Sequence, residues 1–287
     1  MALLPKKLRT YLELVRFEHT LFALPFAYGG MLLGARGLPS AGVFFWITLA
    51  MVGARTASMA LNRLIDWKID AINPRTASRH LPRGVVKPVE VAALSGIGFV
   101  CLVLAALNLN ALTIKLLPVA VFFMVTYSYT KRFTWLCHYW MGLTIGAASA
   151  AGWIAVTGRF EPATFALWAA TLFWLAGFDI LYATQDFQFD RTNGVLSIPA
   201  RFGIAAALRV ARANHLLSWT GLLLTGVLYA AGLWYFAGVF LVGLVLLYEH
   251  SLVKEDDLSK VDAAFFQANV AVSVGMFLFI LTDQIVA

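Results

Sequence analysis

Residues 216–231 read LLSWTGLLLTGVLYAA, and residues 236–248 read FAGVFLVGLVLLY. These runs are continuously apolar, which is typical of membrane-spanning helices and does not match the alternating pattern of a membrane β-barrel. Across the 287 residues, 61% are hydrophobic and 13% are charged, whereas soluble domains carry roughly 45–50% apolar and about 25% charged residues. The composition therefore predicts an integral membrane protein and excludes a soluble enzyme, a disordered chain and a disulfide scaffold.

Polar breaks between the apolar runs predict an all-α fold with nine membrane-spanning helices in a single transmembrane domain, residues 1–287. The predicted spans are 19–35, 42–64, 89–108, 112–129, 137–157, 163–184, 214–231, 234–250 and 264–284. The basic N-terminus and the first apolar run resemble a signal peptide, but Pro25 and the lack of a small-residue cleavage site favour a retained helix. An odd number of spans places the two termini on opposite sides of the membrane.

The basic residues indicate how these helices are oriented, because cytoplasmic loops carry an excess of Lys and Arg. Of the 22 basic residues, the loops on one side hold nearly all, and the opposite loops offer only Arg36, Arg159 and Lys115. We therefore predict a multi-pass protein of the cell membrane whose long polar loops, 65–88, 185–213 and 249–263, face the cytoplasm. Topology accounts for the net charge of +7, and we expect no nucleic-acid partner.

A first acidic cluster lies where the second span ends. Asn62, Asp66 and Asp70 are four residues apart, so on a helix they share one face. Such groups are costly at a membrane boundary unless a positive charge lies between them. Their oxygens suit Mg²⁺, which keeps some of its waters and binds substrate phosphates as well. The cluster therefore predicts a site for Mg²⁺ and a diphosphate.

A second acidic cluster lies where the sixth span ends. Asp179, Tyr182, Asp186 and Asp190 fall at i, i+3, i+7 and i+11, which again predicts one helical face. The last two repeat the four-residue spacing of the first cluster, which suggests a degenerate internal repeat. We predict that the two clusters face each other across one cavity at the cytoplasmic face and grip a metal–diphosphate. The alternative is that these acids merely pair with basic neighbours at the membrane interface.

Basic residues near the clusters are candidates for binding the diphosphate, because they can neutralise charge that metal ions leave and stabilise the departing group. The candidates are Arg75, Arg79, Lys131, Arg132 and Arg191, together with Tyr182.

Candidates for binding an acceptor lie deeper in the membrane. Arg55 precedes Asn62 by about two turns on roughly the same face, where a guanidinium needs an anionic partner and its planar fork suits an aromatic carboxylate. The alternative partner is Asp179. Asp179 is itself a candidate to hydrogen-bond or accept the phenolic proton of an acceptor. Asn62, His138 and Ser149 are further candidates to line the pocket.

Four stretches of the sequence resemble the UbiA superfamily of intramembrane prenyltransferases. The stretch Asn62-Arg63-x-x-Asp66-x-x-x-Asp70-x-x-Asn73-Pro74-Arg75-Thr76 resembles the first family signature, and Asp179-x-x-Tyr182-x-x-x-Asp186-x-x-x-Asp190 resembles the second. Tyr127-Ser-Tyr-Thr-Lys131-Arg132-Phe-Thr is similar to the short basic loop of the family. The opening Arg16-Phe-Glu-His-Thr-Leu-Phe-Ala-Leu-Pro25-Phe-Ala is similar to the start of the 4-hydroxybenzoate and menaquinone-pathway branches.

The resemblance implies nine helices around a central cavity capped by cytoplasmic loop helices. It also implies Mg²⁺-dependent transfer of a prenyl group, through an allylic carbocation, from an isoprenyl diphosphate to an aromatic hydroxy acid such as 4-hydroxybenzoate, in ubiquinone or menaquinone biosynthesis. Two Mg²⁺ ions would be held by Asn62, Asp66, Asp70, Asp186 and Asp190, and the catalytic residues would be these aspartates and Asp179. One departure is Cys137-His138, where quinone-pathway relatives often carry Pro-Gln, which is closer to the menaquinone-type or archaeal branch.

Two other functions remain as alternatives. The first is prenyl transfer to a non-aromatic lipid acceptor such as a glycerol phosphate ether. The second is a secondary transporter, which predicts charges near the membrane midplane in broken helices. Here the charges gather at one face, which favours an enzyme. We expect the lipid bilayer and the two substrates as partners, and no obligate protein partner.

Overall fold

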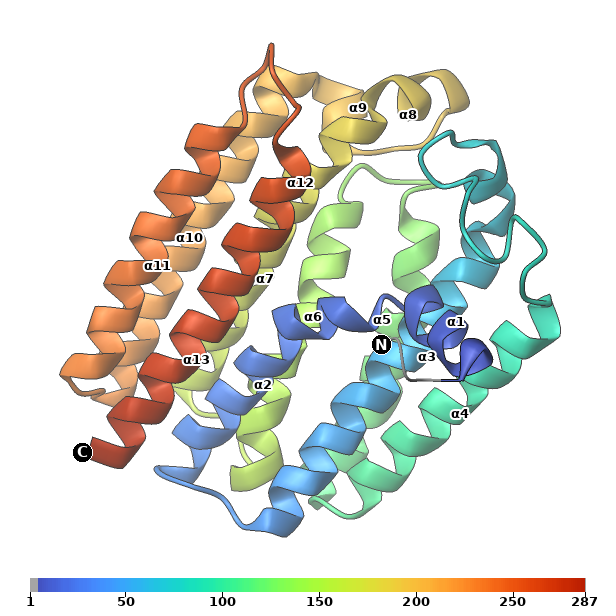
Figure 1. Cartoon of the computed structure of the whole chain (residues 1–287). Helices are drawn as coiled ribbons and strands as arrows, with labels where there is room; N and C mark the ends of the chain where they lie inside the picture. Colours follow the sequence, from blue (N-terminus) through green and yellow to red (C-terminus); the bar gives the residue numbers. More distant parts are fainter. Residues whose placement is uncertain (1–4, 287) are drawn as a thin grey trace.

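The computed structural model describes residues 5–286, and every regular element in that range is helical. Residues 1–4 and 287, the ends of the predicted domain, lie outside the described residues. In Figure 1 the long helices lie side by side, with α8 (Phe187–Asn193), α9 (Ile198–Phe202) and α12 (Val261–Ala263) gathered at one end. We call this end the loop end. The C-terminus lies at the opposite end of the bundle. The all-α prediction is confirmed for the described residues.

The long helices follow the predicted spans closely. They are α2 (Thr20–Ala35), α3 (Ala41–Ile72), α4 (Pro88–Leu107), α5 (Ala111–Thr130), α6 (Cys137–Thr157), α7 (Pro162–Ala183), α10 (Ile204–Tyr229), α11 (Leu233–Leu252) and α13 (Asn269–Val286). The short elements are α1 (Lys6–Leu14), the 3-10 turns η1 (Phe17–His19) and η2 (Thr184–Asp186), and a π-helical turn, η3 (Ala264–Ala268).

The predicted number of spans is not confirmed. Seven helical segments between residues 5 and 286 are long and apolar enough to cross a membrane. The predicted span 19–35 coincides with α2, which has 16 residues and is shorter than the roughly 20 that a full crossing needs. The predicted span 214–231 lies in α10 except for its last two residues, and the buried polar residues Asn214 and His215 interrupt its apolar sequence.

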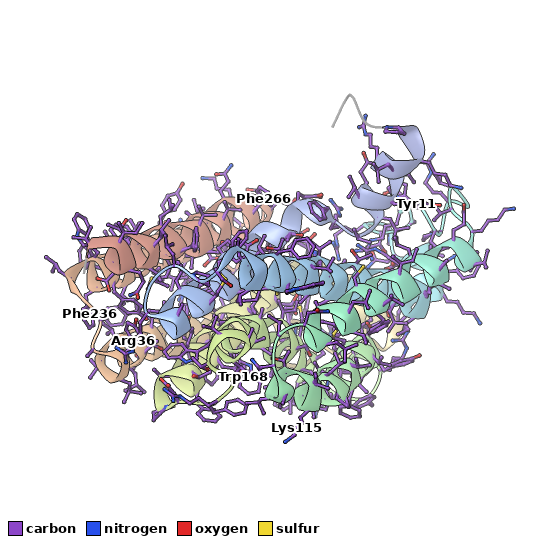
Figure 2. The ribbon with its side chains drawn as sticks, turned by 90° about the horizontal axis from the view of Figure 1, so that it is seen from below. Tyr11, Arg36, Lys115, Trp168, Phe236 and Phe266 are labelled. Carbon is purple, nitrogen blue, oxygen red and sulfur yellow. The ribbon has the colours of Figure 1, made fainter. Side chains whose placement is uncertain are left out.

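The helices contact one another in two groups that share α2 and α6. On one side, α3, α4 and α5 connect α2 to α6, and on the other side α7, α10, α11 and α13 do so. Seen from below, α1 with Tyr11 stands out from one side of the bundle, and Lys115 of α5 projects from the opposite side (Figure 2). The arrangement places α2 and α6 at the centre of the bundle.

Glycines allow α2 and α6 to approach closely. A Cβ atom on Gly152 would lie 2.0 Å from the carbonyl oxygen of Ala27, and one on Gly30 would lie 1.9 Å from that of Ser149. Any larger residue would push the two backbones apart. Small residues at the contact are the usual way for membrane helices to pack, since lipid provides no hydrophobic force between them.

Two helix ends set the position of the acidic clusters. Helix α3 continues to Ile72, so Asn62, Asp66 and Asp70 share one helix as predicted, and the helix ends at Asn73 because Pro74 disfavours a helical conformation in the residue before it. Helix α7 ends earlier than the pattern predicts. The tight turn η2 separates it from α8, so the second cluster does not lie on one uninterrupted helical face.

Helix α1 packs against the loop between α3 and α4, residues 73–87. Leu14 and Val15 bury their side chains with Leu81 and Val86 of that loop. Tyr11 donates a hydrogen bond from Oη to Glu90 Oε1 over 3.2 Å. Because the loop carries two of the candidate diphosphate-binding arginines, the N-terminal helix helps to fix their position.

Candidate active site

Both acidic clusters line one cavity of about 310 Å³ at the loop end of the bundle. The size is at the lower end of the range for ligand pockets, roughly 300–1,000 Å³. Its polar lining includes all six acidic and amide side chains expected from the sequence, namely Asn62, Asp66, Asp70, Asp179, Asp186 and Asp190. The deeper wall includes Arg55 and His138, and the aromatic wall consists of Phe22, Phe178, Tyr182 and Phe265.

Asp66 is the most enclosed acid of the first cluster, with 2% of its surface exposed. Its Oδ2 accepts hydrogen bonds from Lys131 Nζ and Asn62 Nδ2, each at 2.7 Å. Its Oδ1 lies 3.1 Å from Arg132 Nη2 as an ion pair but has no hydrogen-bond partner in the described part of the chain. The basic loop between α5 and α6 therefore neutralises a carboxylate that α3 brings into the cavity.

Asp70 is paired with an arginine from the loop that follows its own helix. Arg79 Nη1 lies 2.7 Å from Asp70 Oδ1 and 2.6 Å from Asp70 Oδ2. The backbone carbonyl of Asp70 also accepts a hydrogen bond from Thr76 Oγ1 at 3.0 Å. These contacts hold the loop over the end of α3 and direct Arg79 toward the cavity.

The same loop reaches across to the second cluster. Arg75 grips Asp186 with a bidentate pair: Nε donates to Oδ1 at 2.8 Å, and Nη2 donates to Oδ2. Arg75 Nη1 donates to Tyr182 Oη at 3.0 Å. Burial lowers the pKa of Arg75, but the hydrogen bond and charge of Asp186 outweigh burial and raise it. Arg75 is thus a permanent cation between the two clusters.

Asp190 lacks a basic partner among the described residues and is 7% exposed. Ser197 Oγ, at the start of α9, donates a hydrogen bond to Asp190 Oδ2 at 2.9 Å. Asp66, Asp70 and Asp186 each pair with Lys or Arg and Asp179 pairs with His138, so Asp190 has the least compensated charge of the five cluster aspartates in the described part of the chain. It is therefore the carboxylate most available to an incoming cation.

The deep end of the cavity holds an Asp–His pair. His138 Nδ1 lies 2.6 Å from Asp179 Oδ2, and the backbone N–H of Ile198 donates to His138 Nε2 at 3.2 Å. Since Nε2 accepts, the ring proton is on Nδ1 and is donated to Asp179. This pair corrects the alternative that Asp179 pairs with Arg55, because α6 and α9 supply the partner instead.

Arg55 lines the same end of the cavity with part of its fork unused. Its Nη2 donates to the carbonyl oxygen of Arg16 at 3.3 Å, whereas its buried Nε has no hydrogen-bond partner in residues 5–286. In that range it also forms no ion pair within 4.0 Å. Nε and Nη2 together form the edge with which Arg75 grips a carboxylate. In Arg55 the Nη2 end of this edge is engaged and the Nε end is not.

Comparison with known proteins identifies the family of this chain. A model of the UbiA prenyltransferase family matches residues 23–279. The chain belongs to the UbiA prenyltransferase family. A 4-hydroxybenzoate octaprenyltransferase from Vibrio atlanticus is 29% identical over 282 residues, covering 96% of this chain and 99% of that protein. The expectation of a prenyltransferase of this family is confirmed.

Solved structures agree with the family assignment. The apo structure of a UbiA homolog from Aeropyrum pernix K1 superposes with a TM-score of 0.85 at 32% identity, covering 93% of this chain and 98% of that one. A UbiA homolog from Archaeoglobus fulgidus bound to GPP and Mg²⁺ shares the fold, with a TM-score of 0.74 at 20% identity and coverage of 95% and 99%.

The donor set of this UbiA family member fits Mg²⁺. The carboxylates and amides are hard oxygen ligands. No three His, Cys, Asp or Glu side chains in the described residues are placed to hold a metal unaided, which agrees with an ion that uses one or two carboxylates together with substrate phosphates. The buried Oδ1 of Asp66, which accepts no hydrogen bond from the described residues, is the atom that most directly calls for a further ligand.

Three candidate residues do not line this cavity. Ser149 is fully buried between α6 and α7, where Oγ donates to the carbonyl of Gly146 at 2.9 Å and lies 2.9 Å from Thr171 Oγ1, so its position does not support acceptor contact. Arg191 is exposed, with its guanidinium 5.5 Å from the ring centre of Phe187. Arg132 lines an adjacent cavity of about 260 Å³ that shares Ile69, Lys131, Phe189 and Val195 with the first.

Sequence reasoning missed other residues of the site. Asn73 stands in the first signature but was not singled out, although its position before Pro74 marks the helix end that aims it at Asp186. Arg63 Nε donates to the carbonyl of Leu14 at 3.2 Å and lines the cavity. Ser197 and Phe265 lie in segments whose sequences carry no signal of a site, since only tertiary packing brings them to it.

Proposed function

We propose that this protein transfers a prenyl group from an isoprenyl diphosphate to an aromatic hydroxy acid such as 4-hydroxybenzoate, as a step in quinone biosynthesis. The proposal rests on the different side chains at the two ends of one cavity. Paired carboxylates and cations line its loop end, and Arg55 and Asp179 lie at its deeper end. The name of the Vibrio relative supports the same acceptor class.

The diphosphate end would bind Mg²⁺ through Asn62, Asp66, Asp70, Asp186 and Asp190, and two ions are expected. When bound, Mg²⁺ supplies charge neutralisation of the departing diphosphate. Arg75, Arg79 and Lys131 now contact carboxylates at hydrogen-bond distance. With the carboxylates occupied by metal, these three cations would be free to turn to the diphosphate oxygens. The A. fulgidus homolog bound to GPP and Mg²⁺ supports this ligand pair.

The acceptor end would orient the ring. The Nε–Nη2 edge of Arg55 fits a carboxylate in bidentate geometry. Asp179 is 28% exposed at the side chain and is held by His138, so one of its oxygens can accept the hydrogen bond of a phenolic hydroxyl. The acceptor is thereby gripped at both ends of its ring.

The reaction then needs few further groups. The allylic C–O bond breaks and its electron pair leaves with the diphosphate. A ring carbon of the acceptor attacks the allylic cation, and the ring proton is lost. The aromatic wall keeps water from the cation, and the faces of its rings stabilise positive charge. Basic side chains at the loop end stabilise the departing diphosphate.

We also propose how the protein lies in the membrane. Alongside the seven long apolar segments, α2 and the second half of α10 complete nine spans of one domain over residues 1–287. The loop end, which holds most of the Lys and Arg, faces the cytoplasm. The active site is then reached by soluble substrates from the cytoplasm and by prenyl chains from the bilayer.

The proposal is tested with purified protein in lipid vesicles, geranyl diphosphate, Mg²⁺ and a panel of acceptors. We expect diphosphate release that depends on 4-hydroxybenzoate, and a prenylated product by mass spectrometry. If a prenylated product formed only with a glycerol phosphate ether, the acceptor would be a lipid and not an aromatic hydroxy acid. Absence of diphosphate release with every acceptor, together with uptake of a solute into vesicles, would favour a transporter.

A further inference from the structure

A buried polar cluster lies outside the cavity, where α10, α11 and α13 meet. His215 Nδ1 lies 2.9 Å from His250 Nε2 and 3.3 Å from Glu249 Oε2. Asn269 Nδ2 donates to Glu249 Oε1 at 3.2 Å. His215 is 2% exposed, and Glu249 and Asn269 are fully buried. Ionisable groups inside a membrane protein are costly, so such a cluster is expected to serve a purpose.

One end of the cluster reaches the π-helical turn η3. Asn269 Nδ2 also donates to the carbonyl oxygen of Phe265 at 2.7 Å. A π turn interrupts the regular hydrogen bonding of a helix, and such turns are frequent at functional sites. Here the side-chain amide of Asn269 ties down the backbone of the residue whose ring lines the cavity.

The other end of the cluster reaches α7. A Cβ atom on Gly177 would lie 2.3 Å from Cδ2 of His215, so the imidazole packs directly on the backbone of α7 at this glycine. Phe178 and Asp179 follow immediately. The cluster therefore contacts two of the three segments that contribute rings to the aromatic wall, α7 and η3.

Phe265 is the centre of that aromatic wall. Its ring centre lies 4.2 Å from that of Tyr182, 5.3 Å from that of Phe178 and 5.4 Å from that of Phe22. Tyr182 in turn accepts a hydrogen bond from Arg75, so the wall begins beside the diphosphate end. A ring in this position would lie against the allylic carbon from which the diphosphate departs.

We propose that Asn269, Glu249 and His215 are positioning residues that hold Phe265 in the wall shielding the allylic cation. The inference rests on the proposed prenyl transfer. A purely structural network would satisfy its polar atoms. Here Asn269 Oδ1 lacks a hydrogen-bond partner within the described residues, and Glu249 Oε2 has only the 3.3 Å ion pair with His215. We therefore assign this cluster the role of holding the backbone at Phe265 in place, and not that of stabilising the fold.

The first test compares Asn269→Leu and Phe265→Leu with the wild-type protein in vesicles. We expect each to lower kcat about 10-fold, within the loss that misplacing a reacting geometry by 1 Å can cause. We also expect a rise in the share of prenyl alcohol, because water adds to the cation and loses a proton, while KM for both substrates changes little. Glu249→Gln keeps an acceptor oxygen for Asn269, so its kcat and its share of prenyl alcohol should stay near the wild-type values. Glu249→Leu removes that oxygen and should resemble Asn269→Leu.

The matched control is Thr225→Val. Thr225 is fully buried in α10, donates to the carbonyl of Gly221 at 2.8 Å, and is not among the described residues that line the cavity. We expect this variant to leave the prenyl alcohol share unchanged. An equal rise in this variant would mean that any loss of buried polarity in α10 disturbs the reaction, and would overturn the proposal.

The second test is the double variant Phe265→Leu/Asn269→Leu. If Asn269 acts through Phe265, the double variant should be no worse than Phe265→Leu alone. Losses that add would show an independent role for Asn269 and overturn the proposal. If Asn269→Leu does not fold, Phe265→Leu tests the proposal by itself. An unchanged share of prenyl alcohol in Phe265→Leu would show that this ring does not shield the cation and would overturn the proposal. Failure of the proposed function is distinct, since the wild-type protein would then form neither product.

Discussion

Asn73 donates a hydrogen bond from Nδ2 to Asp186 Oδ1 over 3.0 Å, joining the end of α3 to the turn η2 that follows α7. Arg75, two residues later, holds the same carboxylate with its fork. The two acidic clusters are therefore fixed relative to each other by side chains of the first family signature. A site built in this way is organised before its ligands arrive, which lowers the cost of binding a highly charged diphosphate.

Asp66→Asn tests the metal and diphosphate end. We expect turnover to fall about 100- to 1,000-fold, the usual loss when one preorganised charge-stabilising group is removed. Diphosphate release measures the effect, and size-exclusion chromatography checks folding. The control is Asp256→Asn, in an exposed loop outside the cavity. Turnover near the wild-type rate in Asp66→Asn would remove this residue from the site.

Arg55→Lys tests the acceptor end. A lysine keeps the charge but loses the planar fork, so KM for 4-hydroxybenzoate should rise about 10- to 100-fold, the size of a lost charge-assisted hydrogen bond. KM for geranyl diphosphate should change less than about twofold. Arg36→Lys is the control, because Arg36 lies against the ring of Tyr229, away from the cavity lining. Equal changes for both substrates would contradict the assignment.

Asp179→Asn tests proton handling at the acceptor. We expect kcat to fall about 100- to 10,000-fold, the range for a lost general base. In His138→Phe, kcat should fall less, because this variant removes only the group that orients Asp179. Because His138 acts through Asp179, the double variant should match Asp179→Asn. Additive losses in steady-state rates would show that His138 acts separately.

Removal of divalent cations should abolish turnover without unfolding the protein. Asp66, Asp70 and Asp186 are each paired with Lys or Arg, so the protein itself balances their charges. We expect chelation to stop diphosphate release and to leave the thermal unfolding temperature within a few degrees. Added Mg²⁺ should restore the rate. Loss of folded protein on chelation would show that metal is part of the scaffold.

Gly152→Ala tests the contact at the centre of the bundle. The new Cβ would lie 2.0 Å from the carbonyl oxygen of Ala27, so α2 and α6 must separate, which should cost about 1–3 kcal/mol as overpacking does. Gly42→Ala is the matched control, since nothing lies within 4 Å of its Cβ position. Its stability should be unchanged or slightly higher. Equal unfolding temperatures for both variants would argue against a tight α2–α6 contact.

Much of the site could be predicted because its residues are local in sequence. Asn62, Asp66 and Asp70 share a face by helical periodicity alone, and α3 confirms this. The interruption at η2 was not predictable, because the four-residue spacing of Asp186 and Asp190 fits a continuous helix equally well. Ser149 was misplaced for a related reason: a small polar residue in an apolar helix can face a cavity or a neighbouring helix, and the sequence does not distinguish the two.

By itself, the sequence determined that this is a helical membrane protein of the UbiA family with acids at two helix ends, because hydropathy, helical periodicity and signature motifs are all local properties. Only the tertiary structure decided the partners: His138 for Asp179, Arg75 for Asp186, and Glu249 for Asn269. These contacts join segments distant in the chain. They depend on how closely glycine-lined helices approach and on where turns redirect them, which no local pattern specifies.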